Sequence, residues 1–434
     1  MPSDSSRGIP RRAFVKSAVA IGGTAALSAC MEREQSLLGD SETTDDGPQF
    51  PRGSPDSLPE GQHEWNDYLV RDAHGNTVPS QQQVLLGLSY DGSTPPTDDE
   101  RERVENSLRT LERAFQWGTG GDPSATFNRG LLSMLSYAPS YFEAVGEVPE
   151  SLVPPREVLE AVGEDPAKTD GFDALLVLTS DIGSVVLAAE AALFGEAETV
   201  NGVEVDATLE GVFSREKRRT GVAGKGIPAD ELDVEGIPEQ APLSMGFKSG
   251  FTDSLPSEEG VTLSEGPLAG GTTLAASRLH IDLERWYEQD HGERTAEMFC
   301  PAHDPKEVGE TGSGLGNDSG IDEEDVASIP EHAERYGRVG HAQKVARARD
   351  DEFKPRMLRR SEGVATDVPD GADFNFTSVQ RTFDAFVDAR AAMNVEEYDV
   401  DVPAEDHGIV DYLETVDRGT YLVPSRAQRA LPVV

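Results

Sequence analysis

Apolar residues along the chain group into short continuous runs and longer periodic segments that follow one another. Residues 82–90 (QQVLLGLSY) form a nearly continuous apolar run, ended by Asp91 and Gly92, and this predicts a buried strand. Residues 98–117 follow a Pro-Pro-Thr-Asp start signal and predict a helix, because the apolar side chains recur at helical spacing at Val104, Leu108, Leu111 and Phe115.

The rest of the first half continues the same alternation. Residues 131–136 and 172–179 (FDALLVLT) have the length and composition of two further strands. A helix is predicted after them, with Asp181 as its N-cap and Ala192 near its end. Strands and helices in this order indicate a ferredoxin-like unit.

The second half repeats this pattern. Residues 271–281 (GTTLAASRLHI) predict a strand that leads into a helix at 282–289. Residues 374–379 (FNFTSV) predict another strand, and residues 381–393 predict a helix. The chain then closes with a short helix and a TYLV strand within 412–423. Two units of one kind in a single chain predict an α+β protein with two ferredoxin-like halves and antiparallel sheets.

The domain boundaries follow from composition. The chain has 434 residues and is 37% apolar, which is enough for a continuous core. Residues 31–61 are rich in Asp, Glu, Ser, Gly and Pro without periodicity, so we expect a flexible acidic tether. The folded halves are expected at 62–240 and 241–434, with folded structure beginning near His63.

The charge balance excludes two classes of partner. The chain carries 80 acidic and 38 basic residues, a formal net charge of −42. A surface of this charge repels nucleic acid phosphates and anionic membranes, so neither is an expected partner. Acidic residues spread over the whole length are typical of a protein adapted to high salt, where screening removes most of the self-repulsion.

The first thirty residues are typical of an export signal. Residues 11–16 (RRAFVK) match a twin-arginine pattern, and residues 18–29 form a short hydrophobic segment that is too short to span a bilayer stably. The segment ends Leu-Ser-Ala-Cys, as a lipobox does, so Cys30 is expected to carry a lipid in the mature protein. We therefore expect export in a folded state and a location at the cell surface, with membrane attachment through Cys30 alone.

The second cysteine, Cys300, is left without a disulfide partner once Cys30 carries lipid. His303 lies close by in sequence, but two ligands do not make a closed metal site. We interpret Cys300 as a small packed residue.

Two further segments allow more than one interpretation. Residues 309–322 are rich in glycine, but no Lys-Ser/Thr pair follows, so a flexible insertion is favoured over a phosphate loop. Residues 215–219 (REKRR) form a basic cluster in an acidic chain. This cluster is either a solvated loop or a positive patch that binds carboxylates near a cavity.

Two segments of the second half carry candidate chemistry. Residues 246–250 (GFKSG) form a turn framed by Gly246 and Gly250, and His341 and Arg359 follow in VGHAQKVARAR and RMLRR. A histidine can ligate iron, and an arginine offers permanently charged donors to developing negative charge. Taken singly, a histidine in a polar segment such as that of His341 is more often a surface residue than a ligand, and Arg359 is also compatible with a surface ion pair.

In combination, these residues resemble the core of the dye-decolorising (DyP-type) haem peroxidases. That family has a Gly-x-x-Asp-Gly turn above the haem, a histidine that ligates the iron from below, and an arginine that returns to the distal side. The resemblance spans roughly residues 82–424 and implies haem b as cofactor. It implies His341 as the iron ligand, and as further cofactor-binding residues Arg359, Gly246, Gly250 and Ser361.

One position departs from the family. Ser249 stands where the family has its distal aspartate, and a serine hydroxyl is a poor general base that mainly orients water. Asp253 would restore a carboxylate if the turn is longer than the spacing suggests. The candidate catalytic residues are therefore Arg359, Ser249 and Asp253.

The function implied by the resemblance is reduction of hydrogen peroxide with oxidation of an unknown reductant. A non-catalytic haem-binding or haem-delivery lipoprotein without the distal aspartate is the first alternative. A haem-free protein with a structural role at the surface is the second. Haem content and peroxide-driven dye oxidation separate the three. The resemblance also implies self-association into a homo-oligomer.

Overall fold

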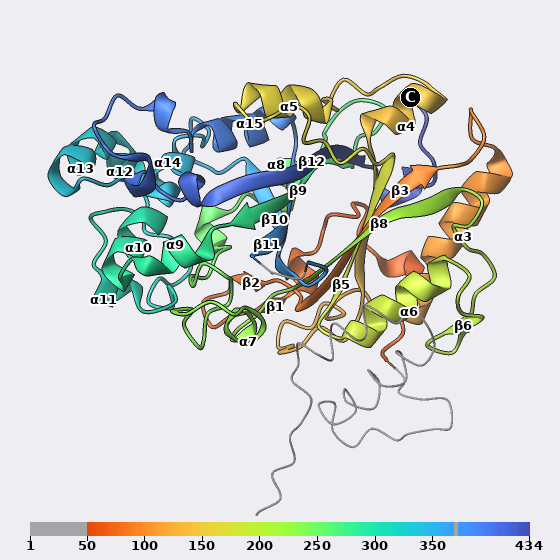
Figure 1. Ribbon diagram of the computed structural model, residues 1–434. Coiled ribbons are helices and arrows are strands. Elements are labelled where there is room, and N and C mark those ends of the chain that lie inside the picture. The colour runs from red at the N-terminus through yellow and green to blue at the C-terminus, as the bar shows by residue number, and fades with distance from the viewer. Residues whose placement is uncertain (1–49, 369–371) are drawn as a thin grey trace, which may run out of the picture.

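The computed structural model describes residues 50–368 and 372–434 (Figure 1). The expected export signal and Cys30 lie outside the described residues. Residues 50–61, expected to belong to the tether, instead pack against the folded domain. The amide of Phe50 donates to Asn201 Oδ1 at 2.9 Å, and the amide of Gly53 donates to the carbonyl of Arg113 at 3.3 Å. These contacts place the start of folded structure before His63.

The first half forms a four-stranded antiparallel sheet in the order β8-β3-β5-β4. Helices α3 and α6 lie beside it, at the right of Figure 1. This strand order is that of a ferredoxin-like unit, as predicted. The elements are β3 (Gln82–Tyr90), α3 (Asp98–Ala114), β4 (Leu132–Tyr137), β5 (Ala174–Ser180), α6 (Gly183–Leu193) and β8 (Phe213–Val222).

Helix α3 begins at a capping box. The hydroxyl of Thr97 accepts a bond from the Glu100 amide, and the Glu100 carboxylate accepts one from the Thr97 amide. This pair satisfies two amides that the first turn leaves without helical partners. The expected apolar stripe is buried, but the helix ends at Ala114 and Phe115 is extended. The predicted end at residue 117 was therefore too late.

Asp181 does not cap α6, as had been predicted. Its carboxylate accepts bonds from the amides of Gln81, at 2.9 Å, and Asn128, at 2.7 Å. The N-cap of α6 is Ile182, without a side-chain bond. Asp181 thus joins two loops that lie beside the start of the helix.

The basic cluster 215–219 is part of strand β8, which the apolar pattern did not predict. Arg215 and Arg218 both pair with Glu190 of α6, at 3.2 and 2.7 Å. Arg219 is buried and pairs with Asp417 at 2.6 Å. The charges of this strand are therefore largely compensated by carboxylates within the fold.

The second half forms a matching sheet in the order β10-β11-β9-β12. The two sheets join at Leu422 opposite Tyr137 and at Val364 opposite Val222, which closes an eight-stranded antiparallel barrel. Strand β10 had not been predicted, and β12 occupies most of the segment expected to begin with a helix. The elements are β9 (Thr272–Ile281), β10 (Met357–Ala365), β11 (Asp373–Gln380), α15 (Phe383–Ala391) and β12 (Leu413–Val423).

Alternate side chains of the strands pack into two different apolar clusters. In β3, Val84, Leu86 and Leu88 pack with the helices, whereas Leu85 faces the interior between the sheets. Successive side chains of a strand point to opposite faces, so a strand buried on both sides reads as a continuous apolar run. This is the pattern that made β3 recognisable.

A group of short helices connects β9 to β10 and lies at the left of Figure 1. Within the described residues, no helix is both long enough and apolar enough to cross a membrane. The group consists of α9 (Leu283–Glu288), α10 (His291–Met298), α11 (Pro305–Val308), α12 (Glu323–Ala327), α13 (Ile329–Tyr336) and α14 (His341–Ala346).

Candidate functional site

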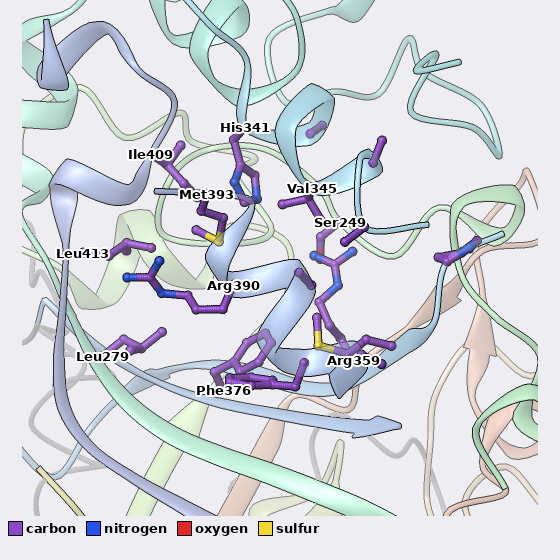
Figure 2. A pocket seen from close by; sticks show the side chains of 18 of the residues that line it. Ser249, Leu279, His341, Val345, Arg359, Phe376, Arg390, Met393, Ile409 and Leu413 are labelled. Atoms are coloured by element: carbon purple, nitrogen blue, oxygen red, sulfur yellow. The ribbon is translucent and has the colours of Figure 1, made fainter. Parts of the chain in front are cut away.

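A cavity of about 480 Å³ lies between one face of the second sheet and helices α14 and α15 (Figure 2). Its volume is in the range of small-molecule and cofactor sites. Much of its wall is apolar, which favours a ligand with a large apolar surface. The apolar side chains include Leu279, Phe374, Phe376, Met393, Ile409 and Leu413.

His341 is the first residue of α14 and reaches into this cavity (Figure 2). The preceding Gly340 lies so close to Phe299 that a Cβ there would stand 2.1 Å from the Phe299 carbonyl oxygen. Glycine at this position thus allows the helix to start against the neighbouring backbone.

The imidazole of His341 is held in its neutral form. Burial, followed by the charges of Lys344, Arg359 and Arg390, lowers the pKa of His341 to about 3. Its Nδ1 is buried without a hydrogen-bond partner in the described structure. A neutral histidine is the form that binds a metal ion.

Arg359 faces the same cavity from strand β10. A β-bulge in the pairing with β11 lies between Arg359 and Ser361, so Arg360 is the extra residue. Met357 and Arg359 line the cavity, whereas the buried Arg360 donates to the His63 carbonyl at 2.6 Å and pairs with Glu258. Bulges often redirect side chains beside functional sites.

The turn 246–250 brings Ser249 to the cavity. Gly246 and Gly250 have φ angles of 93° and 75°, which favour glycine, and these residues shape the turn without lining the cavity. In Figure 2 the guanidinium of Arg359 points toward Ser249. Three residues expected to act together, His341, Arg359 and Ser249, therefore share one cavity.

The glycine-rich segment 309–322 supports this turn, in contrast to the flexible insertion that was expected. The amide of Lys248 donates to the Thr311 carbonyl at 2.9 Å, and the Lys248 ammonium donates to the Gly316 carbonyl at 2.8 Å. The segment thus holds the turn at Lys248, between Phe247 and Ser249.

Two other predicted site residues are placed differently. Asp253 is exposed, its carboxylate accepts a bond from Asn317 Nδ2 at 2.6 Å, and it does not line the cavity. The turn therefore does not present this carboxylate to the cavity. Ser361 lies opposite Thr377 in the β10–β11 pairing, and its side chain lies outside the described part of the structure.

An ionic cluster that the sequence did not predict closes part of the wall. Glu164 accepts bonds from Arg418 at 2.7 Å and from Arg390 at 2.8 Å. Burial alone would raise the pKa of Glu164, but the two guanidinium groups lower it below its usual value. The members lie far apart in sequence, so no local motif indicates them.

A second bulge explains why Arg418 joins this cluster. The pairing of β12 with β9 shifts between Thr415 and Asp417. Val416 is the extra residue, so Arg418 returns to the face of the sheet that Leu413 and Thr415 occupy, and it donates to Ser277 Oγ at 3.0 Å.

Cys300 lies apart from the cavity lining. It is a buried free thiol, 3.4 Å from His332 Nδ1, and burial raises its pKa to about 12. Among the described residues, no group of three or more potential metal-ligating side chains is present. Cys300 is therefore a protonated, packed residue.

Residues 79–425 match the model of a family of unknown function, DUF7405. The chain belongs to this family. No curated protein matches it. The assignment covers both sheets and all of the described cavity.

Solved structures with a similar fold include several DyP-type peroxidases. A DypB variant from Rhodococcus jostii RHA1 in complex with heme is 12% identical, with a TM-score of 0.53 over 85% of this chain and 98% of that one. A DyP-type peroxidase from Cellulomonas bogoriensis is 18% identical, with a TM-score of 0.51 over 84% and 99%. A dye-decolorizing protein from V. cholerae is 13% identical, with a TM-score of 0.51 over 84% and 98%. At these identities the similarity establishes the fold, which is the predicted α+β fold of two ferredoxin-like halves.

Proposed function

We propose that this protein is a haem-dependent peroxidase of the DyP type. The observation that supports the proposal most strongly is the shared cavity, into which a half-buried neutral His341 and the cationic Arg359 both project. Similar folds include a peroxidase solved in complex with heme, which adds independent support.

The residues present fit a haem. A flat apolar cofactor suits a wall formed by side chains such as Phe376 and Leu413. His341 would bind the iron through Nε2, since its Nδ1 is enclosed by protein. Haem, when bound, supplies an iron centre that exchanges electrons with peroxide and with a reductant.

Arg359 and Ser249 then have separate roles in the cavity. The guanidinium of Arg359 would donate hydrogen bonds to the peroxide oxygen on which negative charge develops. Ser249 would orient the peroxide or a water but would be a poor proton acceptor. The described lining holds three carboxylates: Glu164 pairs with two arginines, Glu414 pairs with Lys168, and the exposed Asp165 accepts a bond from the Ala167 amide. We therefore propose that proton transfer runs through water beside Ser249 and is slow for a peroxidase.

The location and the partners of the protein are also part of this proposal. The RRAFVK sequence at 11–16 and the lipobox before Cys30 support twin-arginine export and attachment to the cell surface by a lipid. Export of a folded protein suits a cofactor that is loaded in the cytoplasm. Hydrogen peroxide and a reductant of unknown identity would be the partners, and self-association is proposed from the family resemblance.

Rapid mixing of the haem-loaded protein with hydrogen peroxide tests the catalytic part of the proposal. Arg359→Leu is expected to slow the spectral change about 10²–10³-fold, as the loss of one oxyanion donor does. Ser249→Asp is expected to accelerate it, because a general base contributes roughly 10²–10⁴-fold. Arg156→Leu, at an exposed site on α5 (Pro155–Ala161), serves as the matched control.

If neither cavity variant alters the rate while haem stays bound, the protein carries haem without using it. That result would replace the peroxidase by the haem-binding alternative.

A further inference from the structure

Lys344 is a fully buried lysine one helical turn after His341 on α14. Residues three apart on a helix are neighbours on its surface. The ammonium of Lys344 donates to the carbonyls of Met393 and His407, both at 2.6 Å, and lies 2.9 Å from His407 Nδ1. Burial lowers the pKa of His407 to about 4, so this ring is neutral and can accept the bond. The three polar atoms that contact the ammonium are therefore uncharged.

These bonds join three segments of chain behind His341. Lys344 lies on α14, Met393 follows α15, and His407 belongs to the loop before β12. A Cβ placed on Gly408 would lie 3.1 Å from Lys344 Cε and 3.2 Å from His341 Cα, so the loop packs against both residues. Lys344 thus fixes the position and tilt of the helix that carries His341.

The electrostatic surroundings of His341 are cationic. Lys344, Arg359 and Arg390 are the charged groups that act on its imidazole. A histidine that binds a metal usually donates its second ring N–H to a carboxylate or a carbonyl, which strengthens it as a ligand. His341 Nδ1 has no such partner in the described structure. The ring is therefore a weak electron donor with a buried positive charge beside it.

We propose that Lys344 is a positioning residue for His341, and that its charge raises the reduction potential of iron bound by this histidine. The inference rests on the proposed haem function. A buried cation opposes the extra positive charge of oxidised iron and so favours the reduced form. The low polarity of the site makes this effect larger than the same charge would have at the surface.

A redox titration of the haem-loaded protein, followed by its absorption spectrum, tests the proposal. Burial and the charge of Arg390 lower the pKa of Lys344 to about 7, so the titration is run at pH 6, where the amine is protonated. Lys344→Met is expected to lower the midpoint potential by about 59 mV or more. For one electron, 59 mV corresponds to a tenfold change in the ratio of oxidised to reduced protein. Lys344→Arg is expected to restore most of the loss. Lys306→Met, at an exposed site on α11, is the matched control and is expected to have no effect.

Ionic strength separates a buried charge from a surface charge. The shift in Lys344→Met is expected to persist in 1 M salt, because buried charges are screened much less than exposed ones. Lys344→Gln provides a neutral side chain that can still donate to a carbonyl, so it replaces Lys344→Met if that variant folds poorly. It is expected to show the same lowered potential.

An unchanged potential in either neutral variant, with haem still bound through His341, would overturn this inference and leave the proposed function intact. Failure of both neutral variants to fold, while Lys344→Arg folds, would also overturn it by assigning Lys344 a structural role alone. A wild-type protein that takes up no haem would overturn the proposed function and this inference together.

Discussion

Glu164 neutralises two guanidinium groups in the wall of the cavity, and its replacement by glutamine tests the strength of this ionic cluster. Its carboxylate oxygens lie 2.7 Å from Arg418 and 2.8 Å from Arg390. The side chains of Glu164 and Arg418 are 11% and 3% exposed, so water can replace little of the lost interaction. Glu164→Gln removes this carboxylate from a buried cation, which costs about 3–5 kcal/mol in comparable buried pairs.

Urea-induced unfolding, followed by circular dichroism, measures this loss. The matched control is Glu414→Gln, because Glu414 also lines the cavity but is 70% exposed and pairs with Lys168 at 2.8 Å. An exposed pair contributes little to stability and is weakened by salt, whereas a buried cluster is screened much less. An unfolding free energy for Glu164→Gln within 1 kcal/mol of wild type, or equal to that of the control, would refute the reasoning.

Three further predictions concern other parts of the chain. Burial and nearby guanidinium groups lower the pKa of His63 to about 3, so only the unfolded chain binds this proton in mild acid. The free energy of unfolding should therefore fall by about 2 kcal/mol between pH 7 and 5. His63→Gln should flatten this pH dependence, measured by urea unfolding at each pH, and an unchanged pH dependence would contradict the reasoning. Cys30→Ser should release the protein from membrane fractions, and retention there would argue against a lipid anchor. Gly340→Ala would place a Cβ against Phe299 and should lower the free energy of unfolding in urea by about 1–3 kcal/mol. Gly260→Ala, whose Cβ would have its nearest atom at 3.4 Å, should not lower it, and equal effects of the two variants would contradict the packing argument.

Elements with a strong apolar pattern could be predicted from the sequence. Strands β3, β5 and β9 are buried on both faces, and their apolar runs are correspondingly continuous. Strand β8 escaped prediction because residues 214–217 are exposed and polar, three of them charged, and β3 holds them in the sheet by backbone pairing. Local pattern cannot indicate a strand whose stability comes from its neighbours.

The residues of the candidate site likewise divide into those that the sequence indicates and those that it does not. That His341, Arg359 and Ser249 lie at one cavity could be expected, because the three residues in combination match the pattern of a known family. Glu164, Arg390 and Arg418 could not, because the barrel topology and the bulge at Val416 bring them together. Lys344 could not be predicted either, because its buried partners come from distant segments of the chain.

Haem binding by the purified protein, with and without His341, tests the central claim most directly. Titration with haem, followed at the Soret band, is predicted to saturate at one haem per chain in the wild type. His341→Ala is predicted to abolish the band while circular dichroism shows a retained fold. His280→Ala, at an exposed histidine on β9, is predicted to bind as the wild type does. Full Soret absorbance in a folded His341→Ala protein, or none in the wild type, would contradict the account.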